Sequence, residues 1–184
     1  MRLRTIVPTL MLIVAAAAPL AAQAAPETPE AVAQRYVDAM RRHDWDTMAR
    51  LMHPQAVAKF RTMMGAIMRS QKAGRFREQF FGDSSAAQLD SLSDRDFYAR
   101  FLEAAMSEAE LQAIVDSAQV RILGHVNESP EIVHVVFSMR LPVGPISVVK
   151  PDVITLRREG TGWLALLRAD IEIMAAALQQ RFGT

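Results

Sequence analysis

Three charged residues near the C-terminus have types and spacing that could do chemistry. Arg168, Asp170 and Glu172 follow one another at intervals of two residues. On a β-strand, positions two apart lie on the same face, so these side chains would point to one side of a sheet. A carboxylate pair there could transfer protons or hold a cation. The alternative is a solvated strand end in which Arg168 and Asp170 simply pair, because charges are common at exposed strand ends.

The four histidines show no metal-binding pattern. His43, His53, His125 and His134 lack the HxxxH, HExxH and HxH spacings. His125 and His134 could face each other across a predicted hairpin, but a third ligand is not evident. We therefore expect no metal site.

The sequence lacks several motifs of nucleophilic and cofactor chemistry. The chain contains no cysteine, no GxSxG and no glycine-rich phosphate loop. Met64 and Met68 stand four residues apart, which could suit a soft metal ion, but the same spacing fits an apolar helix stripe. We interpret both as core or as the lining of an apolar pocket, and we assign no catalytic residue, metal or cofactor.

Composition excludes further classes of function. The 184 residues include 21 basic and 20 acidic side chains, and 51% of the residues are hydrophobic. This balance of charge argues against nucleic acid as a partner, and the hydrophobic share argues against intrinsic disorder. The length suits one domain.

The first 24 residues resemble a secretory leader. Arg2 and Arg4 precede a short apolar run, and Ala22-Gln23-Ala24 provides the small-x-small pattern of a cleavage site. Two prolines interrupt the run, which is shorter than the roughly 20 residues that a spanning helix needs. The sequence therefore predicts an export signal over residues 1–24 and a mature single domain over 25–184. We expect this domain to be periplasmic or secreted in a bacterium, without stable membrane insertion after processing.

Hydrophobic periodicity changes from helical to strand-like after residue 118. An apolar period of 3.6 predicts helices over about 29–42, 45–52, 54–73, 93–106 and 107–118, with a loop over 82–93. Alternation then predicts strands over 120–127, 132–141, 146–158 and 163–173, and a short helix over 175–181. This order indicates an α+β fold, with helices packed on one face of a curved four-stranded antiparallel sheet. How the helical middle, 54–118, packs does not follow from the pattern.

The first two predicted helices resemble the opening of the NTF2-like superfamily. Residues 28–40 read TPEAVAQRYVDAM, and residues 43–48, HDWDTM, follow with that superfamily's type of turn. The resemblance implies a cone-shaped domain in which helices enclose a curved antiparallel sheet. Because this fold carries enzymes, binding modules and accessory domains, it implies little about function.

Within that superfamily, residues 34–37, QRYV, resemble the first helix of the ketosteroid isomerases. The resemblance places Tyr36 on their oxyanion-stabilising tyrosine. An ungapped count puts Phe60 where they carry a carboxylate base, and a phenyl ring cannot accept a proton. Asp170 is a positional substitute for their second, acidic donor. The missing base implies binding of steroid-like or other planar apolar ligands without turnover.

A pocket in the cone is therefore the expected site. We expect Tyr36 to point into it, and the pocket candidates are Tyr36, Trp45, Phe60, Met64, Phe97 and Asp170. The alternative is that Tyr36 only packs in the core. The sequence predicts an exported, non-enzymatic binding or interaction protein with a pocket for a small apolar ligand. The alternatives are an isomerase- or dehydratase-type enzyme using Tyr36 and Asp170, and a purely structural, self-associating subunit.

Both faces of a predicted strand carry apolar side chains. Val133, Val135 and Phe137 share one face of the strand 132–141, and Ile132 and Val136 lie on the other. One face meets the helices, so the other is exposed unless something covers it. We expect a homodimer packed through the sheet; the alternative is that the helical middle wraps round this face.

Overall fold

The structure is a computed structural model that describes residues 27–82, 84–143 and 146–182. The predicted export signal, residues 1–24, lies outside this part of the chain. Within the described residues, no helix combines the length and the apolarity needed to cross a bilayer.

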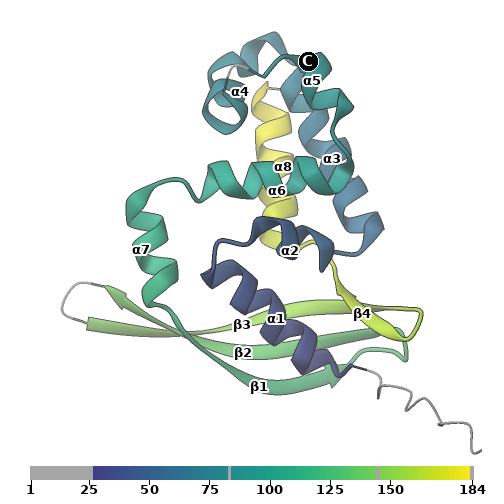
Figure 1. Cartoon of the computed structure of the whole chain (residues 1–184), viewed down its shortest axis with the longest axis vertical. Helices are drawn as coiled ribbons and strands as arrows, with labels where there is room; N and C mark the ends of the chain where they lie inside the picture. Colours follow the sequence, from purple (N-terminus) through teal and green to yellow (C-terminus); the bar gives the residue numbers. More distant parts are fainter. Residues whose placement is uncertain (1–26, 83, 144–145, 183–184) are drawn as a thin grey trace, which may run out of the picture.

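The chain has the predicted α+β order, with helices first and a four-stranded antiparallel sheet after them (Figure 1). The strands lie in the order β1-β2-β3-β4, as a meander. The elements are α1 (Pro29–Arg41), α2 (Trp45–Arg50), α3 (Pro54–Arg69), a 3₁₀ turn η1 (Gln71–Ala73), α4 (Gly74–Phe81), α5 (Ala86–Ser91), α6 (Asp94–Ala105), α7 (Ala109–Ser117), β1 (Gln119–Asn127), β2 (Ile132–Val143), β3 (Ile146–Glu159), β4 (Gly162–Ala165) and α8 (Ala169–Phe182).

Helix α1 begins where the sequence signals a start. The Thr28 hydroxyl accepts a hydrogen bond from the backbone N–H of Ala31 at 3.2 Å, and Pro29 occupies the first helical position. Val32 and Val37 are buried, and the helix packs against β1 and β2. The first predicted helix is therefore confirmed, and its packing holds its middle turns beside the sheet.

The helical middle is divided into more pieces than the periodicity predicts. Helix α3 ends at Arg69, and Gly74 begins α4 where a long helix was expected to stop. The segment 82–93, predicted as a loop, contains α5. There the side chains of Ser85 and Gln88 each accept the other residue's backbone N–H in a capping box.

Aromatic side chains join the helices into a packed core. Phe60 on α3 is fully buried, and its ring centroid lies 5.0 Å from those of Tyr98 and Phe101 on α6. Phe97, on the same helix, is 6.1 Å away. These separations and the tilted or edge-on geometries are favourable for aromatic pairs. The core therefore fixes α3 against α6.

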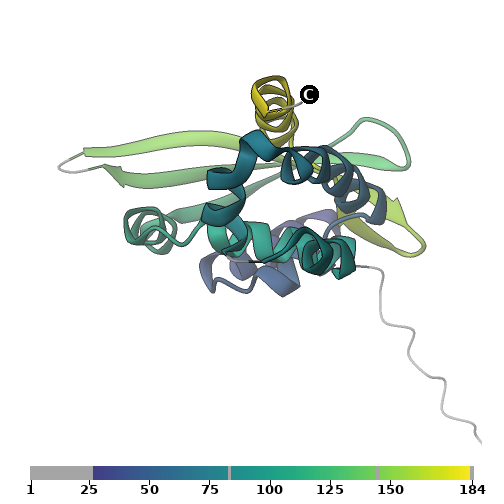
Figure 2. The same cartoon turned by 90° about the horizontal axis from the view of Figure 1, so that it is seen from above.

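The sheet turns one face toward the helices. Val133, Val135 and Phe137 of β2 are buried on this inner face beside Ile154 and Leu156 of β3. Helices α1 and α7 lie over it (Figure 1). Seen from above, the β2–β3 hairpin projects past the helices, and α8 stands on the opposite side of the molecule from α1 and α2 (Figure 2).

The last part of the chain differs from the prediction. β4 ends at Ala165 and α8 begins at Ala169, so the expected strand 163–173 is wrong beyond residue 165, and the expected helix 175–181 is the later part of a longer helix. Ile171 and Ile173 alternate with charged residues and imitate a strand, but the alanine-rich continuation favours a helix.

This correction separates the predicted carboxylate pair. Residues two positions apart on a helix do not share a face, so Asp170 and Glu172 point in different directions. Asp170 pairs with Arg168, while Glu172 binds Lys59 of α3 at 2.6 Å. The simple Arg168–Asp170 pair is therefore the arrangement that the structure contains.

Candidate functional site

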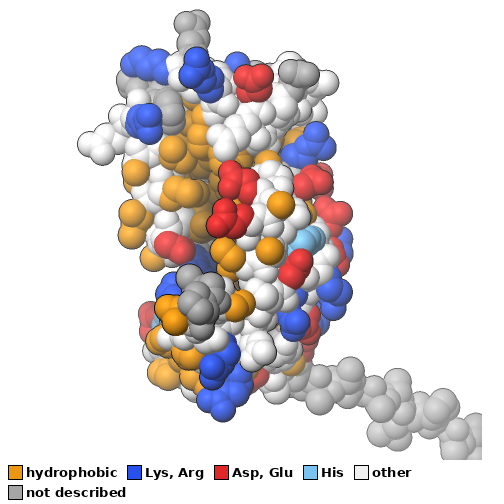
Figure 3. Space-filling view, turned by 90° about the vertical axis from the view of Figure 1, so that its left-hand side faces the viewer, with side chains coloured by type: hydrophobic (Ala, Val, Ile, Leu, Met, Phe, Trp, Pro, Cys, Tyr) orange, Lys and Arg blue, Asp and Glu red, His pale blue; other side chains and the backbone are white. Residues whose placement is uncertain are grey.

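An apolar cavity of about 190 Å³ lies between α1, α7 and the inner face of the sheet. On the side of the molecule that carries α7 and the β2–β3 hairpin, Figure 3 shows a hollow with hydrophobic side chains at its floor and edges. The apolar lining includes Val37 and Met40 of α1, Val115 of α7, Phe137 and Met139 of β2, and Ile154 of β3. Tyr36 and Arg168 also line the cavity and give it a polar end.

Helix α7 is a thin wall of this cavity. Ile114 and Val115 line the cavity, but no residue of α7 is itself buried. A hydrogen bond between His43 Nε2 and Asp116 Oδ1, 3.0 Å long, ties the helix to the turn after α1. A short helix with so few buried groups opens at low free-energy cost, so α7 is the natural route into the cavity.

Two tyrosines meet at the polar end of the cavity. Tyr36 of α1 shares a side-chain hydrogen bond with Tyr98 of α6. Burial raises the pKa of Tyr36 and raises the pKa of Tyr98 well above its usual range, so both phenols are neutral near pH 7. One hydrogen bond between two neutral hydroxyls uses one of their two protons, so the other proton remains for a third acceptor.

Arg168 sits between two carboxylates beside this pair. Its Nε and Nη2 donate to both oxygens of Asp170, at 3.1 and 2.9 Å, and Nη2 also donates to Asp152 Oδ2 at 3.1 Å. Asp152 comes from β3 and its side chain is only 16% exposed. The guanidinium therefore joins the start of α8 to the sheet.

The ion pair sets the charge state of its members. Hydrogen bonding from Arg168 holds the pKa of Asp170 below its usual range, and the bond to Asp170 raises the pKa of Arg168. A carboxylate whose pKa is lowered is a weak base, so Asp170 is poorly suited to remove a carbon-bound proton.

The structure separates the residues that were expected to surround Tyr36. Phe60, Met64 and Phe97 are at most 1% exposed and lie in the helical core, where α3 packs on α6. Their predicted place in the pocket is therefore wrong, because the apolar stripe of α3 faces other helices and not the sheet. Asp170 is next to the cavity only through Arg168.

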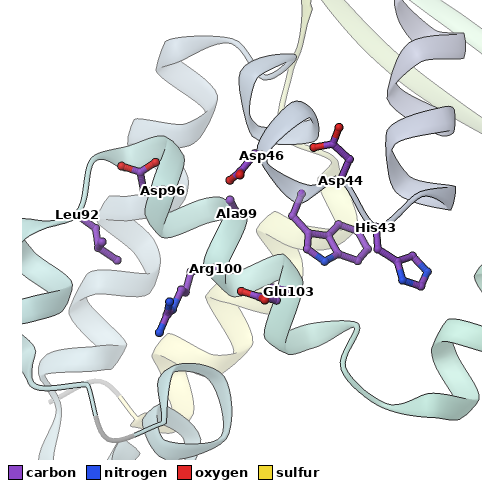
Figure 4. Close-up of a pocket in the computed structure, with 9 residues that line it drawn as sticks. His43, Asp44, Asp46, Leu92, Asp96, Ala99, Arg100 and Glu103 are labelled. Carbon is purple, nitrogen blue, oxygen red and sulfur yellow. The ribbon is translucent and has the colours of Figure 1, made fainter.

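Trp45 lies at a different site, a groove of about 390 Å³ between α2 and α6 (Figure 4). His43 has a left-handed backbone, with φ of 54°, and its ring stacks on Trp45 at 5.6 Å between centroids. Asp46 of α2 and Glu103 of α6 stand on the two walls. The groove is polar and open, so the expectation that Trp45 lines the same pocket as Tyr36 is wrong.

The histidines do not converge. His125 is opposite Val135 in the sheet register and binds Glu30 of α1, while His134 lies on the other face and binds Glu128 at 2.7 Å. Hydrogen bonding to His125 lowers the pKa of Glu30. Among the described residues, no group of three or more His, Cys, Asp or Glu side chains is placed to hold a metal ion.

Sequence reasoning missed two residues of the polar end, Tyr98 and Asp152. The sequence does contain one signal for Tyr98: it is the only tyrosine besides Tyr36. A buried hydroxyl needs a partner, and a second tyrosine on an apolar helix was an available one. No local sequence pattern indicates a role for Asp152, because its partner, Arg168, lies 16 positions further along the chain.

Comparison with known proteins does not place the chain in a family. No family model, no curated protein and no solved structure matches it.

Proposed function

We propose that this protein is an exported, non-enzymatic, NTF2-like binding protein that holds a small apolar ligand in the cavity beside Tyr36. The observation that carries the proposal is the cavity itself, which is apolar along α1, α7 and the sheet and has hydrogen-bonding groups at one end only. Ligand sites commonly combine an apolar lining with a few placed polar groups. Export is supported by the pattern of residues 1–24.

The volume of the cavity limits the size of the ligand. An engineered cavity of about 150 Å³ accommodates benzene, whereas drug-sized ligands occupy about 300–1,000 Å³. At about 190 Å³ the cavity suits one ring with a short substituent. A steroid-sized ligand would need α7 to move outward.

The residues at the polar end of the cavity favour ligand binding over catalysis. Asp170, the carboxylate that was considered as an acid–base partner of Tyr36, pairs with Arg168, and this pairing lowers its pKa. An isomerase or dehydratase needs a base that can take a proton from carbon, and the aligned position, Phe60, is inside the helical core.

Native mass spectrometry of protein purified from a periplasm tests this proposal. We expect a small molecule retained at near-unit stoichiometry, or stabilisation of the emptied protein by isopropylbenzene. Val115→Trp should fill the cavity and abolish both signals. Leu111→Trp is the matched control, because Leu111 is exposed on the same helix outside the cavity. Retention by Val115→Trp, or neither signal in the unmodified protein, would overturn the proposal.

A second candidate function, a self-associating subunit, is favoured by one apolar surface. Val126, Val149 and Val153 on the outer face of the sheet are 41–60% exposed, and Ile173 of α8 is 70% exposed. Monomers seldom leave such a surface uncovered.

A second copy of the chain is the occupant that fits this surface. A two-fold axis would set the apolar outer sheet face of one copy against the same face of the other and so cover the exposed valines of both. Sedimentation velocity at tens of micromolar should show a dimer that Val153→Lys dissociates and Leu111→Lys does not. A monomer at that concentration would exclude this candidate.

A further inference from the structure

The polar end of the cavity contains a cation whose charge is already balanced. Arg168 makes three hydrogen bonds to two carboxylates, Asp152 and Asp170. Lys150 Nζ lies 3.6 Å from Asp152, on a side chain that is 59% exposed. Two positive and two negative side chains therefore meet here, and the nearby Glu172 is paired with Lys59.

Hydrogen-bond donors nevertheless remain at this end. Nη1 of Arg168 carries two N–H groups that have no hydrogen-bond partner among the described residues. The tyrosine pair keeps one O–H proton for a further acceptor, and Tyr36 lines the cavity with Arg168. The site thus offers donors without offering net positive charge.

We propose that the cavity selects uncharged ligands that carry an acceptor oxygen, such as ketones, and rejects carboxylates of the same shape, with Asp152 and Asp170 as the specificity-determining residues. This inference rests on the proposed function, because it concerns the same cavity. An arginine at the end of an apolar pocket would by itself favour a carboxylate ligand.

The physical reason lies in the cost of moving a charge out of water. A ligand carboxylate would be the third carboxylate on one guanidinium, and its desolvation in an apolar cavity would go largely uncompensated. A ketone oxygen loses much less solvation, and it can accept hydrogen bonds from Tyr36 and Arg168. The bidentate Arg168–Asp170 contact also occupies the edge of the guanidinium that a carboxylate would otherwise bind.

Three probes of similar shape test the inference in the processed, unliganded protein. Isopropylbenzene, acetophenone and benzoate share a ring and a three-atom branched group, but they differ in polarity and charge. Isothermal titration at neutral pH should give acetophenone the highest affinity, isopropylbenzene an affinity up to tenfold lower, and benzoate an affinity at least tenfold lower than acetophenone.

Variants then test the assigned residues. Asp152→Asn releases part of the Arg168 charge and should shift the benzoate-to-acetophenone affinity ratio at least tenfold toward benzoate. Asp170→Asn should act in the same direction, and it provides a second test if Asp152→Asn does not fold. Glu172→Gln is the matched control, since Glu172 pairs with Lys59 and not with Arg168, and it should leave the ratio unchanged.

The outcomes separate the inference from the function on which it rests. Benzoate bound as tightly as acetophenone, acetophenone bound no better than isopropylbenzene, or an unchanged ratio in folded Asp152→Asn and Asp170→Asn proteins would each overturn the selectivity while leaving a ligand-binding cavity. Binding of none of the three probes would overturn both.

Discussion

At the scale of single residues, the tyrosine pair is the most informative feature of the molecule. Tyr36 and Tyr98 are the only tyrosines in the chain, and they share one hydrogen bond at the end of an apolar cavity. A hydroxyl buried without a partner costs about 1–3 kcal/mol, so each residue stabilises the burial of the other. The ultraviolet absorbance of tyrosine in this protein therefore comes from this site alone.

We expect the folded protein to form no tyrosinate near pH 10, where free tyrosine ionises. Burial raises both pKa values, so the folded state keeps protons that the unfolded state releases. Stability is therefore unaffected by the tyrosines below about pH 10 and falls as the pH rises above it. Ultraviolet difference titration should show tyrosinate appearing only with unfolding; a reversible transition near pH 10 in folded protein would contradict the burial.

A second residue-scale prediction concerns Arg168. Replacing it by methionine removes three charge-assisted hydrogen bonds, including the one to Asp152, so we expect a loss of about 1–2 kcal/mol at pH 7. The lowered pKa of Asp170 contributes stability above about pH 3.9, and that contribution is lost as the pH falls through the lower folded value. Urea unfolding at pH 7 and pH 3 should show a smaller difference between the two proteins at pH 3. An equal difference at both pH values would exclude the ion pair as its cause.

At the scale of elements, α7 decides access to the cavity. It contributes Ile114 and Val115 to the lining, has no buried residue, and is held by the His43–Asp116 hydrogen bond. The neighbouring α1 has four buried residues and a side-chain cap. Opening of the cavity should therefore occur by motion of α7 while α1 stays in place.

His43→Asn tests this arrangement, because asparagine tolerates the left-handed backbone of residue 43 but lacks the imidazole that binds Asp116. We expect amide hydrogen exchange over 109–117 to accelerate about fivefold, as expected for a contact of ~1 kcal/mol, with exchange in α1 unchanged. Asp116→Asn should have a similar effect, and the double variant should add little. Additive effects, or equal acceleration in α1, would count against the His43–Asp116 hydrogen bond as the contact that holds α7.

At the scale of the whole molecule, one hydrophobic cluster runs from the helices to the sheet. It includes Phe60 and Phe97 of the helical core together with Val135 and Leu156 of the sheet. A continuous core predicts that helices and sheet unfold together as one domain. The two tryptophans report on the two parts, since Trp45 lies on α2 and Trp163 on β4.

Phe60→Ala should destabilise the protein by about 3–5 kcal/mol, because it opens a cavity at the contact of α3 with α6. In Trp45→Phe and Trp163→Phe backgrounds, the fluorescence midpoints in denaturant should fall by equal amounts. Leu111→Ala, at an exposed position, should change stability by less than about 0.5 kcal/mol. A loss seen by Trp45 alone would show that the helical core unfolds separately from the sheet.

Local signals in the sequence determined much of the fold. The cap at Thr28 with Pro29 after it sets the start of α1, and strand alternation after residue 118 sets β1 to β3. These features depend on neighbours within a few positions, so they can be read without knowing the rest of the chain. The α+β class and the position of Tyr36 on an apolar helix face follow from them.

Only the tertiary structure decided what surrounds Tyr36. An apolar stripe shows that Phe60 and Phe97 face a core, but not whether that core is the sheet or another helix. The bonds from Tyr36 to Tyr98 and from Arg168 to Asp152 join positions far apart in the chain, which no periodicity specifies. Residues 171–173 alternate as a strand would, but they belong to α8, which packs on α3. The candidate site therefore arises from packing between elements, whereas local sequence patterns predict each element separately.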